Sequence, residues 1–512
     1  MARRVIWESL SGESPFLALI APLPRGLALE KNALAGVRFR TERGHSKVHV
    51  RRIALLLLCG LPALTGLAGA AGPATSGEVF PFKVYKQTLD NGMRLVVIPY
   101  DSPGTLAFQI VMRTGSRDEV EPGHSGFAHF FEHMMFRGTE RYSQAAYTDV
   151  IKRLGADANA FTTYDETIFH MVAPASQLPL IMDIESDRFK NLKYDQDAFR
   201  TESQAVLGEY NKNVSNPVQP MLEKLHDLAY EKHTYRHTTL GFVQDIKAMP
   251  NYYDYSIQFF NRFYRPENAT LIVVGDVKPE DVFSLAKKYF GDWKKGYKPA
   301  DIPVEPPQKE RKTATLDWPN PTNPYVIMAY HTPAYSATAV DSAALDLIQE
   351  LLFSESAPLY QDLVVKSQWV DFIQGGDSGN RDPGLFFILA RVKSDALIPK
   401  VQETVNRYIQ QLQTTPVDPK KLERIKSHQR YAFELSLDTP GNIAAQAAQS
   451  VAITGGGEAI NQRFAAYQKV TPADIQRVSR EIFKPANETV VTLAHKADAP
   501  AAQGKPGGAS HD

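Results

Sequence analysis

The sequence predicts an α+β protein made of two related domains, and three observations support this prediction. The chain has 512 residues, of which 43% are hydrophobic and 22% charged. This is ordinary globular composition, and it excludes wholesale disorder and a multi-span membrane protein. Strand-like alternation is interspersed with helical spacing. Two stretches of the first half also recur in the second half at nearly the same offset.

The recurring stretches indicate an internal duplication. Tyr264–Thr270, an aromatic-basic-proline turn that leads into a β-branched strand, recurs 219 residues later as Phe483–Thr489. His129–Phe136 is echoed by Leu347–Phe353 at an offset of 218. Because chance matches would not share a register, two echoes at nearly one offset favour duplication over coincidence.

Local patterns place the elements of these domains. Strands are predicted at Arg94–Ile98, Leu106–Met112 and Ile168–Val172, and helices at Ser143–Leu154 and Asp197–Tyr210. The proline-rich residues 294–312 are typical of a stiff exposed linker. We therefore predict domains at 71–293 and 313–497, followed by a Gly-rich, disordered tail at 498–512.

The start of the chain has the pattern of an export signal. Residues 53–72 carry no charge, follow two arginines and end in the small residues Ala68–Ala70. This pattern predicts a signal peptide at 48–70, and hence an exported protein that is periplasmic or secreted and has no stable membrane anchor. Residues 1–47 are then an unstructured extension or a misassigned start. The alternative is an uncleaved anchor, which Pro62 and four glycines in the run disfavour.

Charge and cysteine content narrow the classes of function. Lys and Arg number 57, as do Asp and Glu, but residues 71–512 carry a net charge of −6. A mildly acidic body argues against nucleic acid as a partner. The chain has one cysteine, Cys59, inside the apolar run. This excludes a disulfide scaffold and any multi-cysteine zinc or iron–sulfur site.

The strongest chemical signal is an H-x-x-E-H motif formed by His129, Glu132 and His133. Residues 128–136 contain no glycine or proline, so a helix is predicted there. Histidines at i and i+4 of a helix lie one above the other and can bind one metal ion. Glu132 lies on the same face, where its carboxylate can take a proton from water. The alternative is a pair of histidines that cap or pack a helix.

A catalytic zinc site needs a third protein ligand and an open position. Glu202 and Glu209 lie two turns apart on one face of a second predicted helix, with Val206 between them. One of them can bind the metal while the other supports a ligand or steers a proton. Spacing alone does not distinguish this arrangement from a solvated acidic face.

With these residues in view, the chain resembles the pitrilysin/insulysin/mitochondrial-processing-peptidase family of inverzincin zinc metallopeptidases, in particular its short-chain bacterial branch. Leu89–Gly92 is similar to the family's first strand. Gly115–Glu119 and Gly126–His129 are similar to its approach to the zinc helix, and Phe136–Thr139 to its exit. The resemblance covers roughly residues 85–495 and implies two homologous domains, each a mainly antiparallel sheet covered by helices.

The resemblance also assigns roles to residues. It implies that His129, His133 and Glu209 bind one zinc ion per chain, because the family's third ligand stands about 76 residues after the second histidine. Glu132 is implied to be the catalytic base, and Glu202 to assist it. The implied activity is that of a zinc metalloendopeptidase, which hydrolyses peptides or unfolded segments inside a clamshell chamber.

One further segment resembles the edge strand on which the family holds the substrate backbone by strand addition. It consists of Asn159, Ala160, Phe161 and Thr162. An edge strand offers unpaired N–H and C=O groups to an extended peptide, whatever the side chains of that peptide. The alternative is an ordinary edge strand with no ligand.

The second half departs from the family's pattern. The family supplies there an Arg and a Tyr, seven residues apart, that stabilise the oxyanion and hold substrate. In this chain the matching positions hold Val364 and Asp371, and Leu347 and Leu351 replace the two histidines. The resemblance therefore implies a heterodimer with a related subunit that supplies the Arg and the Tyr. A homodimer is the alternative.

Three other interpretations stay open. The main rival is a catalytically silent assembly or binding subunit of the same family, which zinc content and peptide hydrolysis would distinguish. A zinc hydrolase that does not act on peptides is the second. The third concerns His226, His233 and His237, which are either a second metal site or core and surface histidines.

Overall fold

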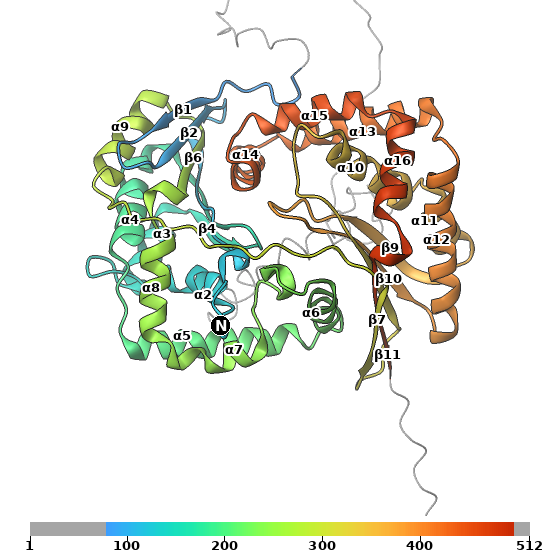
Figure 1. Ribbon diagram of the computed structural model, residues 1–512. Helices are drawn as coiled ribbons and strands as arrows, with labels where there is room; N and C mark the ends of the chain where they lie inside the picture. Colours follow the sequence, from blue (N-terminus) through green and yellow to red (C-terminus); the bar gives the residue numbers. More distant parts are fainter. Residues whose placement is uncertain (1–77, 496–512) are drawn as a thin grey trace, which may run out of the picture.

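The computed structural model describes residues 78–495 (Figure 1). The predicted extension (1–47), signal peptide (48–70) and tail (498–512) lie outside the described residues. Within the described part, no helix combines the length and the apolar character that a membrane span requires.

The first half is built on a six-stranded sheet with the strand order β1-β2-β6-β3-β5-β4. β2 and β6 run parallel, and the other neighbours in the sheet are antiparallel. β4, which contains the predicted substrate segment, forms one edge. The strands are β1 (Tyr85–Thr88), β2 (Arg94–Pro99), β3 (Thr105–Met112), β4 (Asp157–Thr162), β5 (Thr167–Pro174) and β6 (Ala269–Gly275).

The second half repeats this sheet without a counterpart of β1. Its order is β7-β11-β8-β10-β9, and the parallel pair β7/β11 occupies the place of β2/β6. A short 3-10 turn opens the last strand in both halves, at Pro266–Asn268 and Pro485–Asn487. The prediction of two homologous, mainly antiparallel domains is therefore confirmed. The strands are β7 (Lys312–Trp318), β8 (Tyr325–His331), β9 (Val370–Asp377), β10 (Leu385–Val392) and β11 (Glu488–His495).

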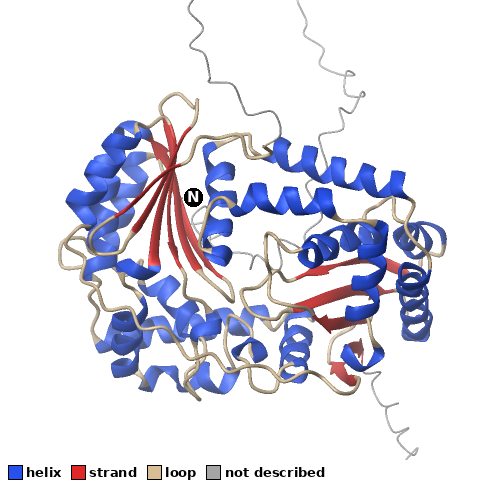
Figure 2. Cartoon of the chain, turned by 45° about the horizontal axis from the view of Figure 1, so that its top comes forward, coloured by secondary structure: helices blue, strands red, loops and turns tan. Residues whose placement is uncertain are grey.

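Helices cover the outer face of each sheet (Figure 2). In the first half these are α2 (Phe127–Met134), α3 (Gln144–Leu154), α4 (Leu178–Asn191), α5 (Gln196–Asn213), α7 (Val243–Ala248), α8 (Tyr253–Phe263) and α9 (Pro279–Phe290). In the second half they are α10 (Val340–Phe353), α11 (Pro358–Tyr360), α12 (Ile398–Thr414), α13 (Pro419–Ser436), α15 (Ala459–Lys469) and α16 (Pro472–Ile482). The strands and helices predicted from periodicity are all present, with ends that differ by at most three residues.

Each half also lends one helix to the other half's sheet (Figure 1). α6 (Val218–Ala229) packs on β7, β8 and β11 of the second sheet. In return, α14 (Pro440–Thr454) packs on β3, β5 and β6 of the first. The inner face of each sheet is therefore buried by chain from the opposite half, and the two domains interlock.

Two arginines of the first sheet bind the carboxyl end of α14. Arg113 Nε donates to Ala452 O at 2.8 Å, and Arg94 Nη1 donates to Gly455 O at 2.9 Å. These carbonyls have no partner within the helix and carry the negative end of its dipole. Burial and the nearby charges of Arg381 and Arg94 lower the pKa of Arg113 to about 10.

The segment that connects the two halves is hydrogen-bonded to the first half and ends in the second sheet. The carboxylate of Glu305 accepts the backbone N–H groups of three successive residues, Glu231–His233, at 2.8–2.9 Å. Lys312, the last residue of the predicted linker, is instead the first residue of β7, because its backbone pairs with Thr489 of β11. The proline-rich segment is thus a strap that ends in a sheet.

Candidate metal centre

The helix that carries the H-x-x-E-H motif is fixed by the two phenylalanines inside the motif. Phe130 and Phe131 are fully buried. The ring of Phe130 lies 5.0 Å from that of Phe199 on α5, and Phe131 stacks on Phe259 of α8 at 5.4 Å. Each buried Phe contributes about 1.5–3 kcal/mol of hydrophobic stabilisation. The apolar face of α2 therefore holds the opposite face, with its histidines and glutamate, in a fixed orientation.

A buried carboxylate holds the first turn of α2. Glu119 accepts the N–H of Gly126 at 2.7 Å and that of Ala128 at 2.6 Å, which satisfies two free donors of the helix. Gly126 has φ +94°, and a Cβ there would lie 2.7 Å from Leu240 O, so the position requires glycine. Burial raises the pKa of Glu119 to about 8.

His129, His133 and Glu209 meet at one point. Glu209 Oε1 lies 3.6 Å from His129 Nε2, and Glu209 Oε2 lies 3.2 Å from His133 Nε2. One potential ligand atom from each residue falls within 4.8 Å of the other two, the only such group found among residues 78–495. The two histidines come from α2, and Glu209 comes from α5, two turns after Glu202.

Glu202 orients one of these ligands. His133 Nδ1 lies 2.9 Å from Glu202 Oε1, and Arg137 binds the other oxygen of the same carboxylate. Because the carboxylate accepts, Nδ1 carries a proton, and Nε2 is the ring nitrogen that faces Glu209. A carboxylate behind a histidine ligand fixes the tautomer and raises the basicity of the metal-binding nitrogen.

The donor set fits a divalent cation. His133 Nε2 lies opposite a carboxylate oxygen, an arrangement that is stable only with a proton or a metal ion between the two atoms. Burial lowers the pKa of His133, but its bonds to Glu202 and Glu209 outweigh burial and raise it to about 10. Burial and the neighbouring His133 lower the pKa of His129 and keep that ring neutral. Two imidazoles and one carboxylate with a remaining open position are the ligand set of catalytic zinc.

Glu132 stands beside this cluster and is bound to the edge strand. Its Oε2 accepts a hydrogen bond from Thr162 Oγ1 at 2.7 Å. In β4 the side chain of Ala160 is buried, whereas Asn159 and Phe161 on the opposite face are half-buried. The outer backbone edge of β4 has no partner strand in the described sheet, as the predicted strand addition requires.

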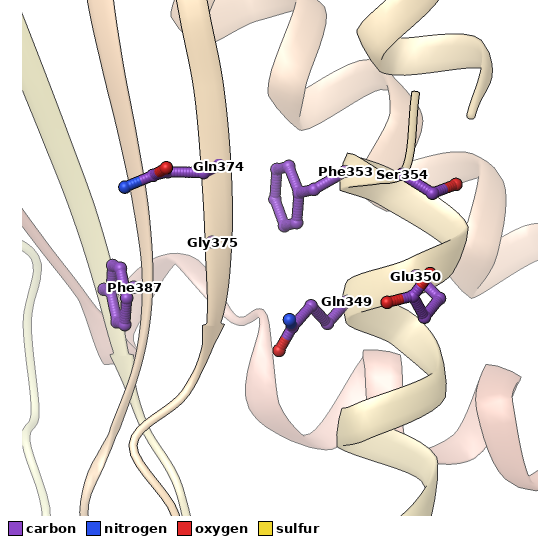
Figure 3. Close-up of a pocket in the computed structure, with 7 residues that line it drawn as sticks. All are labelled: Gln349, Glu350, Phe353, Ser354, Gln374, Gly375 and Phe387. Atoms are coloured by element: carbon purple, nitrogen blue, oxygen red, sulfur yellow. The ribbon is translucent and has the colours of Figure 1, made fainter. Parts of the chain in front are cut away.

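The second half contains the same construction without the ligands. Leu347 and Leu351 on α10 are buried in the hydrophobic core, where the first half has histidines. A cavity of about 150 Å³ lies between α10 and the edge strand β9. Figure 3 shows Gln349 and Phe353 pointing from α10 toward β9 at Gly375.

Val364 and Asp371, which we aligned with the family's Arg and Tyr, are engaged within the second half. Val364, on the π-helical turn η6 (Gln361–Lys366), packs against the core. Asp371 on β9 accepts from Asn323 Nδ2 at 3.0 Å and is paired with Lys393. Neither side chain can donate to an oxyanion as Arg and Tyr do.

The three histidines of the Tyr-rich stretch do not form a second metal cluster among the described residues. His226 Nε2 pairs with Tyr164 Oη at 3.0 Å, and its Nδ1 with the Tyr235 carbonyl at 2.7 Å. His233 Nε2 lies 3.0 Å from Asp382, on a loop of the second half. His237 is buried, with Nδ1 at 3.0 Å from Thr238 O. The core interpretation therefore holds for these residues.

Two residues of the centre were not predicted. Arg137 follows His133 by one turn, a spacing that places it near the same helix face. Glu119 lies in the family-like approach segment, but nothing in the sequence pattern shows that its side chain folds back onto the helix start. Only the tertiary structure reveals that contact.

Comparisons with known proteins agree with this architecture. Residues 95–241 match the family model Insulinase (Peptidase family M16), and residues 253–428 match Peptidase M16 inactive domain. The chain therefore belongs to peptidase family M16, and both of its halves are domains of that family.

Individual relatives match over most of their length. The chain is 27% identical to Zinc protease PqqE of Helicobacter pylori, covering 79% of this chain and 91% of that protein. It is 23% identical to the probable mitochondrial-processing peptidase subunit beta of Schizosaccharomyces pombe, covering 78% and 89%. A crystal structure of a protease from Helicobacter pylori superposes with a TM-score of 0.76 at 26% identity, covering 80% of this chain and 99% of that chain.

Proposed function

We propose that this chain is a zinc metalloendopeptidase of family M16 whose metal is held by His129, His133 and Glu209. The observation that carries the proposal is the convergence of both Nε2 atoms on the Glu209 carboxylate, with His133 oriented from behind by Glu202. A relative named a zinc protease, aligned over most of both chains, supports the same conclusion.

The chemistry follows from the placement of the side chains. His129, His133 and Glu209 would hold a zinc ion, which when bound would supply a Lewis acid for the scissile carbonyl and make water more acidic. Glu132, beside the ligand set but outside it, accepts the proton of the attacking water and later delivers it to the leaving amine. Glu202 keeps His133 in the tautomer that leaves Nε2 free for the metal.

The substrate in this proposal is a peptide or an unfolded segment. An extended chain adds to the outer edge of β4 through backbone hydrogen bonds along Asn159–Thr162. Glu132 is bonded to the last residue of that strand, so a peptide paired there passes next to the base. Backbone pairing accepts many sequences, which suits a broad peptidase.

A related subunit completes the site in this proposal. Val364 and Asp371 leave the second half without the Arg and Tyr donors, and developing negative charge on the substrate needs donors nearby. Relatives named subunit beta of a mitochondrial-processing peptidase show that the family includes chains that are subunits. We infer that the chain is exported and forms a heterodimer in which the partner supplies these donors.

The test combines metal analysis with an unbiased peptide-library digest. The purified mature chain is measured for zinc and incubated with the library alone, with a chelator, and with a related subunit that carries Arg and Tyr. We expect one zinc per chain and cleavage that the subunit enhances and the chelator abolishes. A chain that binds no zinc and cleaves nothing in any combination would refute the proposal.

The same lack of donors favours one rival, a silent assembly or binding subunit. The observation that supports this rival is that Asp371 is already bound to Lys393 and Asn323. In that case zinc would bind, because the ligand set is complete, but no combination of subunits would cleave the library.

A further inference from the structure

We propose that Thr162 is a positioning residue that holds the carboxylate of Glu132 for proton transfer. This inference rests on the proposed peptidase function. Thr162 belongs to the segment expected to hold substrate, but it is only 5% exposed and lies on the same face of β4 as the buried Ala160, opposite Asn159 and Phe161. Its hydroxyl is therefore committed to the protein interior, where it meets Glu132.

The direction of the hydrogen bond follows from the neighbouring hydroxyl. Thr167 Oγ1 donates to Thr114 O at 3.0 Å, so its single proton is used. Thr162 Oγ1 lies 3.4 Å from Thr167 Oγ1 but only 2.7 Å from Glu132 Oε2. The proton of Thr162 thus goes to Glu132, and no proton remains for a bond between the two threonine hydroxyls. A hydroxyl-to-carboxylate bond of this length is charge-assisted.

A rigid turn presents the Thr162 hydroxyl. Thr163 N donates to Glu166 O at 2.8 Å, and Arg117 N donates to Tyr164 O at 2.8 Å, which closes the turn between β4 and β5. A Cβ on Gly115 would lie 2.4 Å from Tyr164 O, so only glycine allows this close contact. These contacts fix the backbone next to Thr162, so only the χ1 torsion of a β-branched side chain sets the position of its hydroxyl.

Fixing one carboxylate oxygen matters because Glu132 has three rotatable bonds before its carboxylate. Among the described residues, Thr162 is its sole hydrogen-bond partner. With Oε2 held, Oε1 is the oxygen left to take the proton of water. When the carboxylate of a general base is not held in position, kcat falls while substrate affinity is unchanged.

The first experiment compares Thr162→Val, which removes the hydroxyl at nearly constant volume, with Thr162→Ser, which keeps it. We expect Thr162→Val to lower kcat about 10- to 100-fold with KM nearly unchanged and full zinc content, and Thr162→Ser to retain most of kcat. Thr315→Val is the matched control, since Thr315 shares a hydroxyl bond with Thr492 in the second sheet. A Thr162→Val enzyme with normal kcat, or with a raised KM only, would overturn the proposal.

A second experiment does not depend on activity. Crystal structures of the wild type and of Thr162→Val should show one ordered Glu132 carboxylate in the first and several conformers in the second. If the valine variant does not fold, Thr162→Ser and Thr162→Ala form the pair that differs in the hydroxyl. Identical Glu132 positions with and without the hydroxyl contradict the inference, even if the chain proves to be a peptidase. Failure of the wild type to cleave peptides contradicts the proposed function instead.

Discussion

The two halves place corresponding helices near corresponding edge strands, yet the first half gathers two histidines and a glutamate where the second half has buried leucines. In the first half, α2 directs His129 and His133 toward Glu209 on α5. In the second half, α10 has Leu347 and Leu351 at these positions, and both are buried. The fold therefore supplies the scaffold for a site, while a few side chains decide whether the site exists.

A glutamate occupies corresponding positions in the two halves. Glu350 occupies on α10 the place of Glu132 on α2, and it lines the cavity in Figure 3. Burial raises the pKa of Glu350, and the neighbouring His428 and Gln429 of α13 partly oppose this. Among the described residues no cluster of potential metal ligands lies beside Glu350, so it is a natural comparison for Glu132.

The largest expected effect comes from comparing these two glutamates. Glu132→Gln keeps the size of the side chain and the ligand set but removes the base, so we expect kcat to fall about 100- to 10,000-fold with zinc retained. Glu350→Gln should leave peptide hydrolysis unchanged. Steady-state kinetics and metal analysis of both variants check this, and equal losses would mean that the halves do not divide labour as described.

A second prediction tries to convert the silent half. Leu347→His combined with Leu351→His places two imidazoles in the core, where burial of polar groups costs about 2–6 kcal/mol in total. We expect a lower free energy of unfolding, measured with urea, and still one zinc per chain, because both positions are buried in the hydrophobic core, where desolvation disfavours a charged ion. Binding of a second zinc would show that ligands alone separate the halves.

Replacing the carboxylate of Glu202, which is bound to His133, should have a smaller effect. In Glu202→Gln the charged acceptor behind His133 is replaced by a neutral amide. Zinc affinity should therefore fall about 10- to 100-fold, as measured by chelator competition. Glu403→Gln is a suitable control, because Glu403 is exposed on α12. Unchanged affinity in Glu202→Gln would limit this residue to a role in packing.

The smallest predicted effect concerns the contact between the first sheet and α14 of the second half. Arg113→Met removes the donor to the last carbonyls of α14 and should cost about 1–3 kcal/mol in urea unfolding. Arg200→Met, on the exposed face of α5, is the comparison. Because each sheet is covered by the other half, both variants should unfold in one transition; two transitions would show that the halves are independent.

Sequence patterns predicted much of this molecule because the relevant signals are local. The spacing of His129 and His133 shows their common helix face, and alternation in Leu106–Met112 shows a strand whatever surrounds it. The repeat offset matched the two sheets because a duplication preserves the order of elements. These features need no knowledge of tertiary contacts.

The remaining features depend on contacts between distant segments. The amphipathic pattern of α6 or α14 shows that one face is buried but not which sheet buries it. The bond from Thr162 to Glu132 joins a strand end to a helix, and no spacing rule connects the two. The Thr162 segment resembled a substrate strand, but which of its side chains face inward became clear only from the sheet.

The exchange of α6 and α14 has a consequence for biosynthesis. The first sheet can close once β6 has left the ribosome, yet the helix that shields its inner surface begins only at Pro440. Until then apolar groups such as Val111 and Ile272 remain uncovered, a situation that invites aggregation or chaperone capture. A nascent chain of this protein is therefore most vulnerable between the completion of its first half and the synthesis of α14.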